Sequence, residues 1–432
     1  MIDETHDPKA GSWVPGADAH PDFPVQNLPL GIYSTAGGAP RPGVAIGDHV
    51  LDLGGAAPLL DDEAARHTAA AAVAAPRLNE LLEHAPEVRR ALRRSLFRLL
   101  SDPSREPGAR ALLRHASECT MHLPVEVRDY TDFYAGIHHA RAVGALLRPE
   151  NPLLPNYKYV PVGYHGRASS IRPSGGKVVR PRGQVRRGEA EPQISPSTRL
   201  DYEVELGLWI GGRSTLGEPI PIAAARDHLA GVCLLNDWSA RDIQAWEYQP
   251  LGPFLAKNFA TTVSPWIVTA DALAPFRVGQ QPRPAGDPSP LPYLLDEADQ
   301  RSGAFDVRIE VSVRSRRMGA EGLPPHRLGR TNALHLYWTP GQLIAHHSVN
   351  GCDLAAGDLL GTGTISGPDD DSRGSLMELS RGGRQPIMLP GGETRTFLED
   401  GDELTLTGWA ERDGYRRIGL GACTATIAPA IA

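Results

Sequence analysis

Three acidic side chains occupy the start of the stretch "DYEVELGLWI", residues 201–210. Apolar and polar residues alternate there, which predicts a strand with Asp201, Glu203 and Glu205 on one face. Three carboxylates on one face repel one another. Two interpretations are open: a polar sheet face in contact with solvent, or a face that holds a cation.

Two aspartates elsewhere favour the cation. Asp132 stands between aromatic residues in "YTDFYAG", and Asp237 follows an apolar run in "LLNDWSARD". An aspartate in such surroundings is costly to bury unless it is paired or bound to a metal. Carboxylate oxygens around one point would suit calcium or magnesium rather than zinc. The sequence leaves open whether these four residues converge.

A histidine pair could supply a base. His138 and His139 are adjacent in "GIHHARAVG", so their side chains point in different directions and at most one would do chemistry. A histidine held by a carboxylate can activate water. The candidate partner is Glu378, an acid within the apolar stretch "GSLMELS". His346 and His347, in "AHHSVNG", are interpreted as structural.

The segment "ARDIQAWEYQPLGPFLAKNF" offers cationic and amide groups. Arg241 and Gln244 are three residues apart and share one face if the segment is helical. Lys257 is one of only four lysines, and its compact ammonium would suit a metal site or a developing anion. The alternative is a lysine that lies along an apolar surface with its head in solvent. "GTGTISG", at 361–367, is either a turn close to a ligand or a simple loop.

Composition narrows the class of protein. The chain has 432 residues and a net charge of −7, which argues against nucleic-acid binding. Four scattered cysteines are typical of a reduced compartment. We see no signal peptide, no apolar run long enough to span a membrane, and no nucleotide-binding glycine motif. We therefore expect a cytoplasmic protein with no membrane or nucleic-acid partner.

The pattern of elements predicts an α+β protein that is mainly β. Residues 1–124 form a small N-terminal domain: an irregular arm at 1–28, short strands with a hairpin at Gly47–Asp48, and helices within 62–118. Residues 125–432 alternate short strands with turns and form a large sandwich or barrel-like domain. The arginines of the helical segment are interpreted as a solvated face rather than a binding patch: Arg89, Arg90, Arg93, Arg94 and Arg98.

Long motifs in a fixed order carry a family resemblance: "DYTDFY", "VPVGYHGRASSI", "LDYEVELG", "NDWSARDIQAWEYQPLGPFLAKNF", "HHSVNGCDL", "GTGTISG" and "GSLMELS". Together they closely resemble the fumarylacetoacetate hydrolase family. The resemblance covers roughly residues 25–430, is weakest in the helical stretch 60–118 and in the Pro-rich loop at 274–292, and leaves the N-terminal arm outside. The resemblance implies metal-dependent hydrolysis of the carbon–carbon bond of fumarylacetoacetate, the last step of tyrosine and phenylalanine catabolism. It also implies a small β-barrel-like element in the N-terminal domain, a C-terminal β-sandwich roll, and a homodimer.

The same resemblance implies roles for individual residues. A calcium or magnesium ion would be held by Asp132, Glu203, Glu205 and Asp237, and Lys257 and Thr261 match a second, magnesium site that shares Asp237. The catalytic histidine falls on His139 and its activating acid on Glu378, while Arg241, Gln244 and Lys257 surround the reacting carbonyl. Substrate contacts are implied for Tyr134, Arg148, Tyr164, Gln244, Tyr248, Gly363 and Thr364.

Three questions stay open at this level. The spacing of "DFY", four residues and then His-Ala assigns the base to His139, although His138 precedes it. A related acylpyruvate or diketo-acid hydrolase or decarboxylase would share the carboxylates. A non-catalytic, metal-stabilised binding protein would share them too, but would leave His139, Glu378 and Lys257 unexplained.

Overall fold

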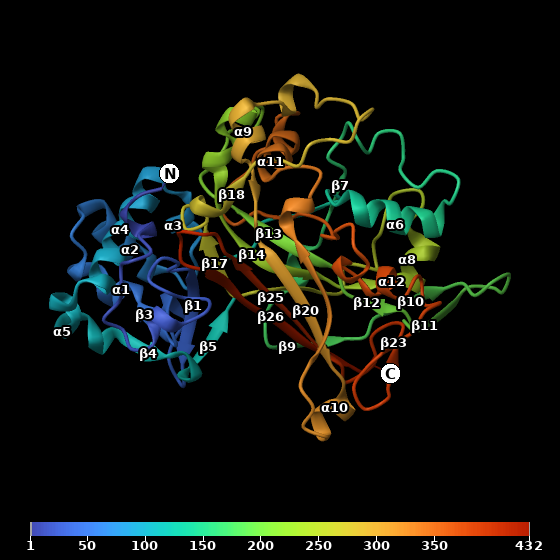
Figure 1. Cartoon of the computed structure of the whole chain (residues 1–432), viewed down its shortest axis with the longest axis horizontal. Helices are drawn as coiled ribbons and strands as arrows, with labels where there is room; N and C mark the ends of the chain where they lie inside the picture. Colours follow the sequence, from blue (N-terminus) through green and yellow to red (C-terminus); the bar gives the residue numbers. More distant parts are fainter. Residues whose placement is uncertain (1, 432) are drawn as a thin grey trace.

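The computed structural model describes residues 2–431, and a single large sheet runs through both halves of the chain (Figure 1). Along its main path the strands follow the order β4 (Leu113–His115), β3 (His49–Asp52), β2 (Arg41–Ile46), β1 (Leu30–Thr35), β17 (Trp266–Thr269), β14 (Leu229–Asp237), β13 (Val204–Ile210), β22 (Leu359–Gly361), β6 (Tyr130–Phe133) and β7 (Gly163–His165). Off this path lie β16 (Thr261–Val263), β8 (Ile171–Pro173) and β5 (Cys119–His122).

A second sheet covers one face of the first. Its order is β21 (His326–Asn332), β20 (Arg308–Arg314), β25 (Glu403–Ala410), β26 (Ile418–Ala428) and β9 (Gly176–Val179). Strands β25 and β26 pack against β14, so β14 is buried along its whole length, whereas β20 and β25 alternate buried and more exposed residues. This pattern is that of two sheets packed face to face over a shared apolar core.

Four short two-stranded ribbons, twelve α-helices and thirteen short 3-10 helices complete the described part of the chain. The ribbons pair β10 (Arg182–Val185) with β11 (Gln193–Pro196), β12 (Leu200–Asp201) with β15 (Ser239–Ala240), β18 (Arg277–Val278) with β19 (Ala304–Phe305), and β23 (Ile387–Met388) with β24 (Thr394–Arg395). The helices are α1 (Leu53–Ala56), α2 (Glu63–Ala71), α3 (Asn79–Glu83), α4 (Pro86–Ser101), α5 (Glu106–Ala109), α6 (Ile137–Leu147), α7 (Ile222–Ala225), α8 (Arg241–Glu247), α9 (Glu297–Ser302), α10 (Arg316–Ala320), α11 (Pro340–Ser348) and α12 (Leu376–Leu379).

The N-terminal arm is irregular, as expected, but it is anchored to both halves. Asn27 Nδ2 donates to the carbonyl oxygens of Asp22 and Gly419, each at 2.7 Å, and so ties the arm to β26. The guanidinium of Arg93, on α4, donates to Thr5 Oγ1 at 3.1 Å and to two backbone carbonyls of the arm. These bonds account for the order of a segment that has little regular structure.

The interpretation of the α4 arginines as a solvated face is wrong for Arg93, which is buried. Periodicity could not reveal this, because the arm that covers Arg93 comes from another part of the chain. The predicted hairpin is confirmed: β2 and β3 pair through Ile46 and His49, and Gly47 takes the positive φ of 53° that the turn requires.

The α+β fold, with a small N-terminal and a large C-terminal sheet domain, is confirmed. The boundary between 124 and 125 stays a prediction, because β1 pairs directly with β17 and the sheet crosses it. Among residues 2–431, no helix is both long enough and apolar enough to cross a membrane.

Candidate active site

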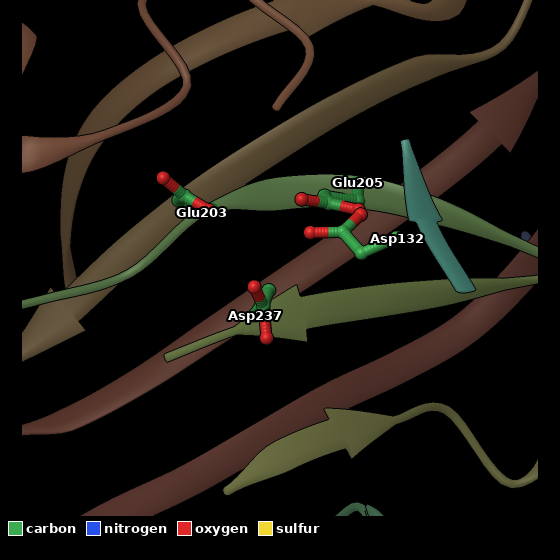
Figure 2. A group of neighbouring side chains, drawn as sticks. All are labelled: Asp132, Glu203, Glu205 and Asp237. Atoms are coloured by element: carbon green, nitrogen blue, oxygen red, sulfur yellow. The ribbon is translucent and has the colours of Figure 1, made fainter. Parts of the chain in front are cut away.

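Four buried carboxylates converge where three strands of the large sheet meet (Figure 2). Glu205 lies in β13 and Glu203 just before it, Asp132 lies in β6, and Asp237 is the last residue of β14. One oxygen from each lies within 4.8 Å of the others. The alternation of the strand predicted the shared face of Glu203 and Glu205, but the solvated alternative is wrong, because both side chains are buried.

Glycine at position 361 makes room for this convergence. Gly361, in β22, pairs with Asp132 on one side and with Gly207 of β13 on the other. A Cβ atom at Gly361 would lie 2.7 Å from Asp132 Oδ1 and 2.9 Å from Glu205 Oε2. The missing side chain therefore leaves a space lined by carboxylate oxygens.

The four carboxylates differ in how they are neutralised. Burial and repulsion from Asp237 raise the pKa of Asp132 well above its usual range, and burial together with Asp132 does the same for Glu205. Burial also raises the pKa of Glu203, but Lys257 and Arg241 outweigh this effect and hold it well below its usual value. Only one side of the cluster is thus neutralised by the protein.

Lys257 supplies much of that neutralisation. Its ammonium donates to Glu203 Oε2 and, at 2.6 Å, to Asp237 Oδ2. Thr261 Oγ1 donates to Asp237 Oδ1 at 3.0 Å, and Tyr164 Oη donates to Asp237 Oδ2 at 3.1 Å. Burial lowers the pKa of Lys257, but the two carboxylates hold it above its usual value, so it stays charged. A protonated amine has no lone pair for a metal; the second site that would use Lys257 and Thr261 stays a prediction.

The other side of the cluster fits a hard divalent cation. Asp132 Oδ1 and Glu205 Oε1 are buried and make no hydrogen bond within the part of the chain that the structure describes. Glu205 Oε2 accepts a bond from the Gly363 amide at 3.0 Å, which orients it. Buried, unpartnered carboxylate oxygens are the ligands that calcium and magnesium prefer.

His139 forms a dyad with Glu378 at the edge of the carboxylates. The Nδ1 atom of His139, near the start of α6, lies 2.6 Å from Glu378 Oε2, and its Nε2 atom lies 3.6 Å from Glu203 Oε1. Burial lowers the pKa of His139, but Glu378 and Glu203 outweigh it and raise the pKa to about 9. The bond at Nδ1 leaves Nε2 as the nitrogen that faces the cluster. The ring of His138 instead packs edge-on against His335.

Two serines fix Glu378 in place. Ser375 caps the short helix α12, and its Oγ also lies 2.8 Å from Glu378 Oε2; Ser366 Oγ lies 3.0 Å from the same atom. Sequence reasoning missed both serines, although the "GTISG" and "GSLMELS" motifs contain them.

Asp201 links the site's arginine to the helix that carries Glu378. Its Oδ2 accepts from Arg241 Nε at 2.8 Å, and its two oxygens accept from the amides of Leu376 and Met377 at 2.8 and 3.1 Å. Arg241 Nη1 lies 2.8 Å from Glu203 Oε1 and donates to Gln244 Oε1 at 3.1 Å, which confirms that Arg241 and Gln244 share one face of α8. Arg241 Nη2 is buried and makes no hydrogen bond to residues 2–431.

The remaining expected substrate residues surround this centre to different degrees. Tyr134 packs edge-on against the His139 ring at 5.6 Å, and Arg148 lies near enough to act electrostatically on Tyr134. Thr364 is buried, with its carbonyl against Gly136 at the start of α6. Tyr248 ends α8 and is half-buried, and no side-chain bond connects it to the carboxylates. A cavity of about 200 Å³ opens beside the cluster, lined by Tyr164, Asp237, Lys257 and Thr261 among others.

Comparison with known proteins assigns the chain to a family. A family model described as fumarylacetoacetase N-terminal matches residues 26–124, and one described as fumarylacetoacetate (FAA) hydrolase C-terminal matches residues 129–428. The fumarylacetoacetase of Arabidopsis thaliana is 47% identical over 426 residues, with 96% of this chain and 97% of the relative covered. The human fumarylacetoacetase is 44% identical over 437 residues, with 97% and 99% covered.

A solved structure shares the fold at low identity. The fumarylacetoacetate hydrolase of Exiguobacterium antarcticum gives a TM-score of 0.51 at 17% identity, covering 93% of this chain and 99% of that one. The chain belongs to the fumarylacetoacetate hydrolase family.

Proposed function

We propose that this protein is a hydrolase that cleaves the carbon–carbon bond of fumarylacetoacetate to give fumarate and acetoacetate. The observation that carries the proposal is the His139–Glu378 dyad beside four buried carboxylates, in a chain 44–47% identical over nearly its whole length to fumarylacetoacetases. An acylpyruvate or other diketo-acid hydrolase or decarboxylase is the alternative, and the full-length relatives do not favour it.

The dyad would provide the general base. Glu378 accepts the Nδ1 proton of His139, and a cation bound beside Glu203 would offset the carboxylates that raise the pKa of the ring. The neutral ring could then take a proton from a water molecule at Nε2. The hydroxyl would add to the keto carbon next to the double bond of the fumaryl group. The bond from this carbon to the acetoacetate methylene would then break, and the methylene carbon would receive the proton. One water is consumed, and fumarate and acetoacetate are released.

Donors around the dyad would stabilise negative charge on the attacked oxygen. Arg241 Nη2 is free to donate, and Gln244 and Lys257 lie on the same side of the site. One such donor is typically worth about 3 to 4 kcal/mol in the transition state. Tyr134, Arg148, Tyr164, Tyr248, Gly363 and Thr364 would complete the substrate pocket.

Asp132, Glu203, Glu205 and Asp237 would hold a calcium or magnesium ion. When bound, such a cation supplies Lewis-acid stabilisation of developing negative charge and relieves the repulsion among its ligands. The Asp132 and Glu205 oxygens without protein donors support this assignment. Lys257 holds the pKa of Glu203 low and donates to Asp237, and Tyr164 and Thr261 keep Asp237 oriented.

The family resemblance extends the proposal to the protein's setting. We infer that it acts as a cytoplasmic homodimer at the last step of tyrosine and phenylalanine catabolism. The four cysteines form no disulfide among the described residues, which agrees with a cytoplasmic location.

The test is the loss of fumarylacetoacetate absorbance, with acetoacetate quantified, for wild type, His139→Ala and His138→Ala. Each protein is assayed with chelator and with added calcium or magnesium. Cleavage that depends on metal and is lost only in His139→Ala supports the proposal. A folded, metal-loaded wild type that leaves fumarylacetoacetate intact would transfer the assignment to another diketo acid.

A further inference from the structure

A second cavity lies far from the carboxylates, between α4 and the start of β14. Its volume is about 340 Å³, within the range of about 300–1,000 Å³ that is usual for small-molecule sites. Its floor is apolar, with Leu92 and Leu96 from α4 and Leu229 from β14. Its lining also includes Thr269, the last residue of β17, and Arg277, the first residue of β18.

The charge of the lining is strongly positive in a chain whose net charge is negative. Two aspartates line the cavity, Asp227 and Asp271. Six arginines line it as well: Arg89, Arg90, Arg93, Arg226, Arg277 and Arg412. Six positive against two negative groups leave an excess of four positive charges.

Most of these arginines have no anionic partner. Arg90 pairs with Asp271 at 3.1 Å, and Arg93 is occupied by the arm. Arg89, Arg226 and Arg412 donate to neutral oxygens, namely the Asp227 carbonyl, Ser302 Oγ and the Pro275 carbonyl, each at 2.9 Å. None of these three lies within 4.0 Å of a carboxylate of residues 2–431.

The guanidinium of Arg277 has the fewest polar partners of the six. The Arg277 side chain is half-buried and stacks on the Phe305 ring at 4.6 Å, and the guanidinium makes neither an ion pair nor a hydrogen bond within residues 2–431. Burial and the neighbouring Arg226 lower the pKa of Arg277 to about 10, which still leaves it charged at neutral pH. A planar fork of donors that is held by stacking is a typical receptor for carboxylate or phosphate oxygens.

We propose that this cavity binds a small organic anion with two or more negative charges, recognised through carboxylate or phosphate oxygens by Arg277, Arg226, Arg89 and Arg412. The apolar floor accommodates the carbon body of such a ligand, and the guanidiniums contact its oxygens. The site is separate from the proposed active site, and its occupancy does not depend on the reaction assigned there.

The test measures binding of phenyl phosphate, succinate and inorganic phosphate to the magnesium-loaded protein, by calorimetry and by the shift in melting temperature. Sodium chloride at the same ionic strength is the reference. We expect saturable binding of at least one probe and a melting temperature raised by a few degrees at saturation. Tighter binding of phenyl phosphate than of succinate assigns the phosphate class, and the reverse assigns the carboxylate class.

Variants separate this site from general charge effects. Arg277→Gln should weaken binding at least tenfold. If Arg277→Gln fails to fold, the double variant Arg226→Gln/Arg412→Gln, at two exposed positions, replaces it and should also weaken binding. Arg417→Gln is the matched control, because Arg417 also stacks on an aromatic ring, Trp409 at 4.6 Å, and does not line the cavity. Shifts no larger than with chloride, or equal affinities in Arg277→Gln and wild type, would overturn the proposal. None of these readouts uses catalytic activity.

Discussion

The two ends of β14 border sites of opposite charge, and the charged groups of the two sites are buried to different degrees. At one end Asp237 joins the carboxylate cluster; at the other, Leu229 and Ala230 line the arginine-rich cavity. The carboxylates of the cluster are all buried, whereas Arg226 and Arg412 of the cavity are exposed.

This difference decides how strongly each end needs a ligand. Water cannot solvate the oxygens of Asp132 and Glu205, so each must take up a proton or a cation. Water can solvate Arg226 and Arg412, and neutral oxygens, Asp271 or an aromatic ring contact the other arginines, so an anion there adds stability but is not required by the fold. Changes in the cluster should therefore have large effects, and changes around the cavity small ones.

The largest expected effect comes from Glu205→Gln. It removes a cation ligand, and the loss of several kcal/mol of transition-state stabilisation corresponds to an activity about a thousandfold lower. The ion-free variant should be at least as stable as ion-free wild type, because a neutral amide removes the cost of burying an ionisable group beside Asp132. Glu203→Gln is the contrast: it breaks the contacts with Lys257 and Arg241 and should cost about 3 to 5 kcal/mol. Activity assays and urea denaturation measure both. Equal destabilisation by the two substitutions would contradict the cation site.

Lys257→Met tests the neutralised side of the cluster. It leaves Glu203 and Asp237 buried without their ammonium, and we expect a loss of about 3 to 5 kcal/mol in the free energy of unfolding of the ion-free protein. Lys177→Met on β9 is the control; Lys177 is exposed, so its replacement should stay within about 0.5 kcal/mol. A cost for Lys257→Met as small as that of the control would show that the ion pairs contribute little.

Asp201→Asn tests whether Asp201 positions the catalytic groups. It would disturb both Arg241 and α12, so kcat should fall about 10- to 100-fold with a smaller change in KM. Asp402→Asn is a matched control, because Asp402 is also buried and bonds both an arginine, Arg395, and a backbone amide, but outside the site. Both variants should lose stability, and only Asp201→Asn should lose kcat. Similar kcat values in the two variants would reduce Asp201 to a structural role.

The smallest effect concerns pH and the arm beside the arginine-rich cavity. Burial and Arg93 lower the pKa of His6, whose Nε2 lies 2.8 Å from the Asp271 carbonyl oxygen and whose Nδ1 lies 3.1 Å from Asp3 Oδ1. Below about pH 6.5 the unfolded chain takes up a proton that the folded arm resists, so stability falls as pH falls. We expect the free energy of unfolding to fall between pH 7 and pH 5.5, and this fall to be absent in His6→Gln. Urea denaturation at both pH values measures this change. Equal changes in the free energy of unfolding in wild type and His6→Gln would contradict the role of His6.

Local patterns were good predictors where the information is local. Alternation over 201–210 placed Glu203 and Glu205 on one face, and the spacing of Arg241 and Gln244 placed both on one face of α8. The Gly47–Asp48 turn followed from the same kind of short-range rule.

The same local patterns did not predict contacts between residues far apart in the sequence. Asp201 belongs to the acidic face by alternation, yet it pairs with Arg241 and two amides of α12. Arg93 belongs to the solvated face of α4 by periodicity, yet the arm buries it. In both cases the partner lies far along the chain, so no window of sequence contains the interaction.

The sequence by itself therefore determined which reactive groups are available. It determined the residue types, the faces on which they lie, and the ordered motifs that define the family. The tertiary structure decided which groups meet. It brought Asp132 beside Glu205 because β22 carries glycine at 361, turned His139 rather than His138 toward Glu378, and gathered arginines from α4, β18 and the loops around one cavity. The physical reason is that the energy of a buried charge depends on its neighbours in space, and only the folded sheets specify those neighbours.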